Sequence, residues 1–170
     1  ITIKNMIIIL KNKERLICDD FIFKCAIGEN GKIKNKKEGD KRTPKGLFSL
    51  GNLFYRHDRK VKPETKLKCI KITKKMGWCD DPTSKKNYNK LIHFNKKTNF
   101  KFERLFKKNS TYDYLIPINY NKKRKQGKGS AIFIHLTNNF KKTLGCIALR
   151  ERDFLILTKL IDRDTKIKIY

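Results

Sequence analysis

Two residues that can do covalent chemistry together lie in the C-terminal third of the sequence. His135 follows a short apolar run rich in β-branched and aromatic residues, and Cys146 comes eleven residues later, directly after Gly145. A thiol is a strong nucleophile only as a thiolate, and a neighbouring imidazole can take its proton and later hand it to a leaving amine. The pair therefore predicts nucleophilic acyl transfer, with Cys146 as the nucleophile and His135 as the base.

Both residues also have ordinary structural explanations. A lone Cys between apolar residues is usually a small buried hydrophobe, and a lone His at a strand end is usually a satisfied structural residue. Residue types and spacing alone leave the two interpretations open.

The turn that carries the thiol has further features suited to acyl transfer. Glycine lets the backbone approach a substrate closely, so the backbone amides of Gly145 and Cys146 are candidates for an oxyanion hole. Helical periodicity begins soon after Arg150. The sequence thus also predicts a positive helix N-terminus near the loop, which would lower the pKa of the thiol.

The arrangement resembles the catalytic core of the L,D-transpeptidase family, the YkuD-type domain. The family pattern is a histidine, a variable gap and then Ser/Thr-x-Gly-Cys, and this chain reads GSAIFIH followed by TLGCIAL. Other stretches look like one branch of that family: Glu38-Gly39-Asp40, TPKG at 43–46, GWCDDP at 77–82, Tyr88-Asn89 and Tyr112-Asp113. The resemblance covers nearly the whole chain.

The chain departs from the family pattern at two positions. Many members have a second histidine directly before Gly-Cys, where this chain has Leu144, and an Asn or Arg two positions after the Cys, where it has Ala148. The nucleophile and base carry over to Cys146 and His135, but no family role carries over to Leu144 or Ala148. Arg150 is a candidate substitute for the anion contact.

The resemblance implies peptidoglycan remodelling by a cysteine acyltransferase. Cys146 would attack the L-centre carbonyl of a meso-diaminopimelate residue, expel the terminal D-Ala and form a thioester. An amine from a second stem peptide would then complete an L,D cross-link. Water as the acceptor would make the same site an L,D-carboxypeptidase, and the sequence does not separate these activities. Thr143 would orient the loop, and no metal or organic cofactor is required.

An irregular central region offers weaker candidates for substrate binding. Trp78 and Asp80 lie beside a Pro-directed turn and could line a cleft in which the carboxylate meets an ammonium group, and Tyr88 extends the same region. The alternative is that Trp78 anchors a loop to the core while Asp caps that loop. We slightly favour this structural interpretation.

The cysteines and histidines do not indicate a metal site. They are Cys18, Cys25, Cys69, Cys79 and Cys146, with His57, His93 and His135. No C-x-x-C spacing occurs and no two histidines are spaced as paired ligands, so zinc is not expected. Because five is an odd number, at least one thiol stays free or pairs between chains in an oxidising compartment, and Cys146 is our candidate for the free one.

The elements that must position these residues are mainly strands. Short apolar runs at 6–10, 15–18 and 21–27 predict consecutive strands, and 69–72 alternates apolar and basic residues in the manner of a half-buried strand. Residues 43–46 predict a turn.

The remaining elements lie on either side of the His–Cys segment. Residues 102–106 predict a helical turn or a loop, and residues 112–120 predict an edge strand, because Pro117 cannot donate to a ladder. Residues 151–162 have the apolar spacing of an amphipathic helix, and residues 165–170 alternate as a closing strand.

These elements predict a single domain over residues 1–170, which is long enough to bury a core. Many short strands with one helix near the C-terminus indicate a mainly β fold. The resemblance implies an L,D-transpeptidase-like β-sandwich of mixed sheets, with the helix after the catalytic Cys.

The chain carries 43 Lys and Arg against 16 Asp and Glu, a formal net charge of +27. Such a charge first suggests nucleic acid, yet it is spread along the chain, and abundant Lys, Asn and Ile indicate a compositional bias. We expect no specific nucleic acid partner, whereas peptidoglycan stem peptides, which carry free carboxylates, suit a positive surface. Two alternatives stay open: a basic nucleic-acid-binding domain with an inert Cys146, and a non-catalytic relative that binds cell-wall peptide.

The apolar run at 6–10 is too short to span a membrane and lacks a small-residue cleavage site after it. We therefore expect no transmembrane segment, and no signal peptide is visible. Peptidoglycan chemistry nevertheless predicts the periplasm or cell envelope of a bacterium, and we expect a monomer.

Overall fold

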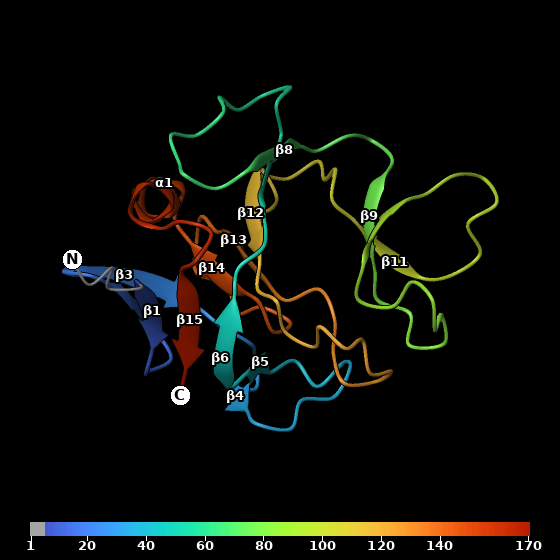
Figure 1. The fold of residues 1–170 in the computed structure, drawn as a ribbon, viewed down its shortest axis with the longest axis horizontal. Coiled ribbons are helices and arrows are strands. Elements are labelled where there is room, and N and C mark those ends of the chain that lie inside the picture. The colour runs from blue at the N-terminus through green and yellow to red at the C-terminus, as the bar shows by residue number, and fades with distance from the viewer. Residues whose placement is uncertain (1–5) are drawn as a thin grey trace.

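A computed structural model describes residues 6–170, and most of its strands belong to one ten-stranded mixed sheet (Figure 1). The order is β6-β15-β1-β2-β3-β14-β13-β12-β7-β8. These strands are β1 (Ile7–Leu10), β2 (Arg15–Cys18), β3 (Phe21–Ala26), β6 (Gly46–Ser49), β7 (Leu53–Tyr55), β8 (Cys69–Lys71), β12 (Tyr114–Pro117), β13 (Phe133–Leu136), β14 (Ile147–Leu149) and β15 (Lys166–Ile169).

Three smaller elements complete the fold. A three-stranded sheet has the order β10-β9-β11, from β9 (Met76–Cys79), β10 (Leu91–His93) and β11 (Phe102–Arg104). A two-stranded ladder joins β4 (Lys32–Ile33) to β5 (Thr43–Pro44), so residues 43–46, for which a turn is predicted, instead begin with a short strand. The helix α1 (Glu151–Leu160) follows β14.

The large sheet folds back on itself at β3. Residues 21–24 of this strand pair with β2, whereas Cys25 and Ala26 pair with β14. The apolar side chains of the two halves therefore meet in one core, with Ile8 and Leu16 from the first half and Ile134 from the second fully buried. This arrangement confirms the predicted mainly β sandwich of mixed sheets.

The helix α1 covers an outer part of this core, as its apolar spacing predicts. Phe154 and Leu157 are fully buried, and the ring of Phe154 stacks on Tyr114 with centroids 5.9 Å apart. Glu151 and Asp153 lie in the first turn, where the helix dipole favours negative charge.

Two predicted elements are wrong. Phe102–Arg104 is strand β11, which pairs with β9, rather than a helical turn or a loop. Strand β12 lies inside the sheet between β7 and β13, rather than at its edge. Pro117 is tolerated because β12 ends there and its ladder with β7 covers only Tyr114 and Leu115.

A second apolar cluster joins the three-stranded sheet to the opposite face of β12 and β13. Met76, Leu115 and Phe133 belong to it, and the ring of Trp78 packs edge-on against Phe133 at 5.2 Å. In Figure 1 the small sheet stands beside the large one, to its right. Cys146, the predicted nucleophile, belongs to this second cluster.

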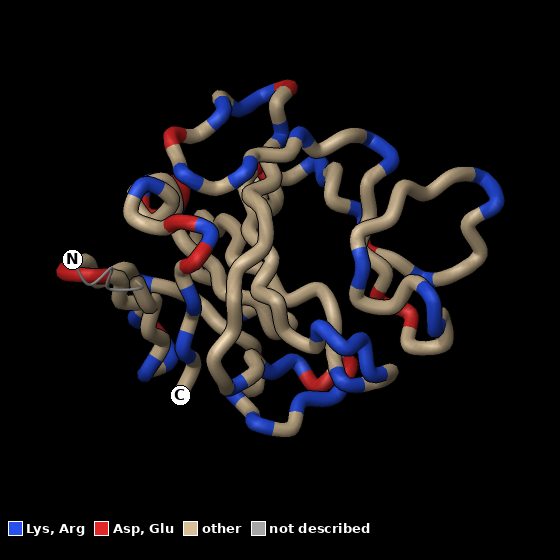
Figure 2. The backbone as a smooth tube through the Cα atoms, viewed as in Figure 1, with Lys and Arg blue, Asp and Glu red and all other residues tan. Residues whose placement is uncertain are grey.

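Positive charge is distributed over the loops on all sides of the molecule (Figure 2). No helix within residues 6–170 has the length and apolar character that crossing a lipid bilayer requires.

Candidate active site

The register of two neighbouring strands brings the predicted nucleophile and base together. Strands β13 and β14 are parallel, with Ile134 opposite Ile147 and His135 opposite Ala148. Cys146 directly precedes Ile147 and so lies opposite Phe133. Because residues two apart in a strand share a face, the side chains of Cys146 and His135 project from the same face of the sheet.

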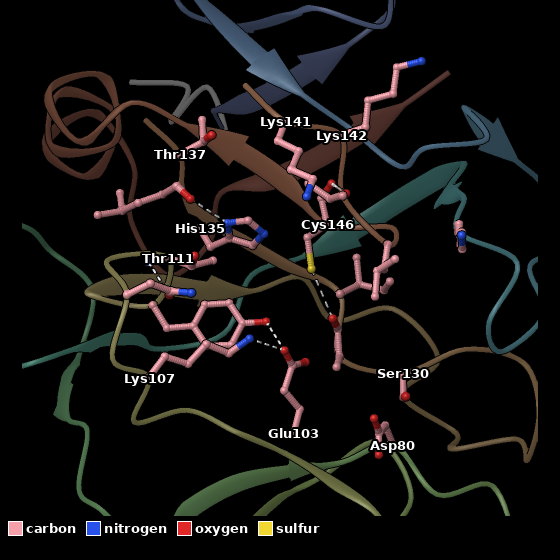
Figure 3. Close-up of a pocket in the computed structure, with 18 of the residues that line it drawn as sticks. Asp80, Glu103, Lys107, Thr111, Ser130, His135, Thr137, Lys141, Lys142 and Cys146 are labelled. Atoms are coloured by element: carbon pink, nitrogen blue, oxygen red, sulfur yellow. Dashed lines mark hydrogen bonds and ion pairs between the residues drawn. The ribbon is translucent and has the colours of Figure 1, made fainter. Parts of the chain in front are cut away.

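Both residues line a cleft of about 850 Å³, and each is only 8% exposed. The opposite side of the cleft carries Asp80 and Glu103 from the small sheet (Figure 3). Leu144, which stands where many family members have a second histidine, also lines the cleft and is 74% exposed.

The tautomer of His135 is set by its backbone neighbour. Nδ1 lies 2.9 Å from the carbonyl oxygen of Leu136. Because a carbonyl oxygen only accepts, Nδ1 carries the hydrogen and Nε2 keeps its lone pair. Figure 3 shows the other ring nitrogen turned toward the sulfur of Cys146. Burial also lowers the pKa of His135, so the imidazole is neutral, as a general base must be.

The thiol of Cys146 makes its hydrogen bonds to the neighbouring backbone. Sγ donates to the carbonyl oxygen of Ala131 at 3.3 Å and accepts from the N–H of Phe133 at 3.3 Å. Within the described part of the chain, no hydrogen bond joins Sγ to His135. Proton transfer to the imidazole therefore requires the thiol to rotate away from Ala131.

Burial and, to a lesser extent, the nearby Glu103 carboxylate raise the pKa of Cys146 to about 12, against the opposite effects of the Phe133 N–H, Lys107 and Lys36. The predicted lowering by a helix N-terminus is wrong. Helix α1 begins at Glu151, after β14, so its N-terminus lies at the other end of that strand from Cys146. The resting site is a neutral thiol beside a neutral imidazole.

Thr143 organises the turn that carries the thiol. Its hydroxyl donates to the carbonyl oxygen of Cys146 at 2.6 Å and accepts from the N–H of Gly145 at 3.1 Å. The Gly145 N–H is thus engaged, whereas the Cys146 N–H donates to no acceptor among residues 6–170. Of the two predicted oxyanion-hole amides, that of Cys146 is the one available.

Thr43, from the TPKG stretch, also stabilises this turn. Its hydroxyl donates to the carbonyl oxygen of Gly145 at 2.9 Å and accepts from the N–H of Gly28 at 2.9 Å. Gly145 has φ 141°, and a Cβ there would lie 2.9 Å from the carbonyl oxygen of Arg42. A side chain at position 145 would therefore force the turn away from this support.

The Glu38-Gly39-Asp40 stretch supports the cleft wall. The carboxylate of Glu38 accepts from the hydroxyl of Ser130 at 2.8 Å, next to the strand that carries His135. Asp40 pairs with the buried Lys36 at 2.5 Å. Both Lys36 and Ser130 line the cleft.

Asp80 is the only one of the four weaker site candidates that reaches the cleft. Trp78 donates from Nε1 to Asn89 and packs on Phe133, which is the anchoring role given above as its alternative. Because Trp78 does not line the cleft, it is not placed to contact a substrate there.

Tyr88 and Arg150 also lie away from the cleft. Tyr88 is fully buried, where its hydroxyl donates to Glu38 and accepts from the N–H of Gly129 at 2.9 Å. Arg150 is exposed at the start of α1, with its guanidinium 5.2 Å above the ring of Phe140. Neither side chain is placed to contact a substrate that lies against Cys146.

A charged group that the sequence did not indicate lies beside the candidate catalytic pair. The carboxylate of Glu103 accepts from the hydroxyl of Tyr112 at 2.8 Å and from Nζ of Lys107 at 2.7 Å. The ring of Tyr112 in turn packs edge-on against His135 at 5.5 Å. The available signal was the alternation of charged Lys101 and Glu103 around Phe102, which is typical of a strand with one polar face.

Among residues 6–170, no group of three His, Cys, Asp or Glu side chains could hold a metal ion. The five cysteines are all free thiols.

Comparison with solved structures finds three proteins to which this chain is similar. The helical cell shape determining protein Pgp2 of Campylobacter jejuni is 18% identical, with a TM-score of 0.51 over 97% of this chain and 47% of that one. Bd1075 of Bdellovibrio bacteriovorus is 14% identical, with a TM-score of 0.50 over 98% and 48%. L,D-transpeptidase 1 of Mycobacterium tuberculosis is 10% identical, with a TM-score of 0.42 over 97% and 61%.

The chain spans about half the length of the first two of these proteins. No curated protein sequence matches it significantly. The family model of the L,D-transpeptidase catalytic domain (YkuD), however, matches residues 4–169. With its His–Cys pair in one cleft and this match along nearly its whole length, the chain belongs to the L,D-transpeptidase catalytic domain family.

Proposed function

We propose that this protein is a cysteine acyltransferase of the L,D-transpeptidase type, acting on peptidoglycan stem peptides. One observation carries the proposal. Cys146 and His135 project from neighbouring parallel strands into one cleft, and the imidazole is held in the tautomer that leaves Nε2 free.

In the acylation step, the thiol proton passes to Nε2 of His135 as sulfur attacks the L-centre carbonyl carbon of meso-diaminopimelate. The carbonyl oxygen becomes an oxyanion, for which the free N–H of Cys146 is a donor. The C–N bond to the terminal D-Ala then breaks, and the imidazolium returns its proton to the leaving amine. A thioester on Cys146 and neutral His135 remain.

In the second step, an acceptor amine attacks the thioester and loses a proton to His135. The C–S bond breaks, the thiolate takes the proton back, and an L,D cross-link is released. With water as the acceptor, the same sequence of bond changes gives a carboxypeptidase.

Residues outside the reacting pair act through position. Thr143 and Thr43 fix the carbonyl groups of Cys146 and Gly145, and so hold the amide of the turn in place. No step uses a metal or an organic cofactor.

The fold also suggests the biological role and location of the proposed reaction. Pgp2, which has this fold, is a cell shape determining protein. From this likeness we propose a role in wall remodelling that affects cell shape, in the periplasm or cell envelope of a bacterium. We also propose that the protein acts as a monomer.

Intact-protein mass spectrometry tests the proposed chemistry. Wild-type protein is incubated with a meso-diaminopimelate tetrapeptide and, separately, with a carbapenem. We expect an adduct on the wild type and none on Cys146→Ala. Cys69→Ala, which removes the one half-buried cysteine among the five, should keep the adduct. A folded wild type without any adduct would refute the proposal.

Analysis of the released peptides then identifies the acceptor. Cross-linked dimers indicate an amine acceptor, and tripeptide alone indicates water.

A further inference from the structure

One polar atom in the cleft has no partner. Among residues 6–170, Oδ1 of Asp80 is the only buried side-chain nitrogen or oxygen without a hydrogen bond. Asp80 also forms no ion pair with any described residue. A buried acceptor without a partner is costly, so its presence in a cleft indicates a missing donor.

The register of the small sheet aims this carboxylate at the proposed active site. Cys79 pairs with Phe102, and Trp78 pairs with Glu103. Asp80 therefore shares a face with Trp78 and Glu103, and this is the face that packs on the large sheet through Trp78 and Phe133. Figure 3 shows Asp80 and Glu103 on the side of the cleft opposite His135 and Cys146.

The charges around Asp80 favour a cation as the missing donor. Burial raises the pKa of Asp80, and the carboxylates of Glu103 and Glu38 raise it further, whereas Lys101 acts in the opposite direction. Lys107, which also lines the cleft, already forms an ion pair with Glu103. Glu38 and Asp80 thus line the cleft without an ion pair to any described residue, although Lys101 also lines it and the protein as a whole is strongly positive.

We propose that Asp80 binds a primary ammonium group of the substrate, and that the substrate is a stem peptide with a free amine on the side chain of its diaminopimelate residue. This inference rests on the proposed function, because it places the peptide across the cleft from Cys146. Asp80 is then a specificity-determining residue, which distinguishes a peptide with a free side-chain amine from one whose amine is blocked.

The same contact helps the chemistry. The Glu103 carboxylate disfavours the thiolate at Cys146. An ammonium group that enters beside Asp80 and Glu103 offsets this negative potential. Binding of the correct peptide therefore eases ionisation of the thiol.

Equilibrium binding to Cys146→Ala protein tests the site without turnover. Two tetrapeptides are compared by isothermal titration calorimetry, both acetylated at the N-terminus, and one also acetylated on the diaminopimelate side-chain amine. We expect the free amine to bind about tenfold more tightly or better, as a charge-assisted hydrogen bond in a cleft predicts.

A second substitution in the Cys146→Ala background assigns the preference to one residue. Asp80→Asn keeps the shape of the side chain and should abolish the preference. Asp20→Asn removes an equal charge at an exposed position away from the cleft and should leave it unchanged. Thermal unfolding of each variant shows that it is folded.

Equal binding of the two peptides, binding of neither, or a preference that survives Asp80→Asn would overturn the inference. Acylation of the wild-type protein tests the proposed function in a separate experiment. Acylation without amine preference refutes only the ammonium site, whereas preference without acylation refutes only the acyltransferase.

Discussion

The neutral resting state of Cys146 predicts how fast the thiol reacts with iodoacetamide. Its pKa is raised from 9.0 to about 12, so near neutral pH it holds about 1,000-fold less thiolate than an ordinary cysteine, or about 4 kcal/mol. A thiolate of higher pKa is more nucleophilic, which recovers roughly 20- to 30-fold. We therefore expect alkylation on the order of 50-fold slower than that of a short peptide containing the same cysteine.

The dependence on pH distinguishes this state from a preformed thiolate–imidazolium pair. Because the thiolate fraction grows tenfold with each pH unit below the pKa, the rate should rise about tenfold per unit from pH 7 to 10, without a plateau. The measurement is the rate of carbamidomethylation at Cys146, resolved from the other cysteines by peptide mass. Cys146→Ala provides the blank.

Two charge variants test the cause of the raised pKa. Glu103→Gln keeps an acceptor for Tyr112 but removes the negative charge that disfavours the thiolate, so it should speed alkylation severalfold. Lys107→Met removes a positive charge and should slow it. A rate that is flat between pH 5 and 8, or a shift in the same direction by both variants, would refute the reasoning.

Three further predictions concern stability. Asp80→Asn should stabilise the protein by about 1 kcal/mol at pH 8, since it removes an unpaired carboxylate. The raised pKa of Asp80 means that the folded state takes up its proton more readily than the unfolded state, so this gain should disappear below the ordinary value of 3.8, and equal urea midpoints at pH 8 would contradict it. Thr43→Val should cost about 2 kcal/mol and slow acylation, because Gly145 and Gly28 both lose a buried hydrogen bond; unfolding curves and acylation rates check this. Phe154→Ala should cost about 3 to 5 kcal/mol in denaturant unfolding and leave acylation by the folded fraction unchanged, because its ring lies fully inside the main core.

The elements that were predicted correctly are those whose signal is local. The apolar runs at β1 and β2 and the helical spacing of α1 are complete within a few residues of sequence. The position of β12 inside the sheet and the pairing of β11 were not predictable in this way. Both depend on partner strands far along the chain. Pro117 suggests an edge strand, but the ladder between β12 and β7 covers only Tyr114 and Leu115 and so does not require a donor from Pro117.

The same distinction between local and long-range signals applies to the candidate site. The sequence indicates His135 and Cys146 because a strand end and a glycine turn are local features, and it offers Asp80 as a weaker candidate because that residue stands beside a Pro-directed turn. The direction of the pKa shift at Cys146 was wrong, since burial is decided by Tyr112, Phe133 and other residues of the second cluster. Glu103 was missed because its strand was not recognised.

The spacing between the proposed base and nucleophile along the chain is independent of their spacing in the molecule. Hydrogen bonding between β13 and β14 aligns His135 with Ala148, whatever path residues 137–146 take between the two strands. This connection can therefore be short here and longer in other members of the family without moving sulfur relative to imidazole. Within this connection, residues 137–142 precede the turn that Thr143 and Gly145 fix, so they are free to vary in length and composition, and so to change which substrates are admitted, while the reacting atoms stay in register.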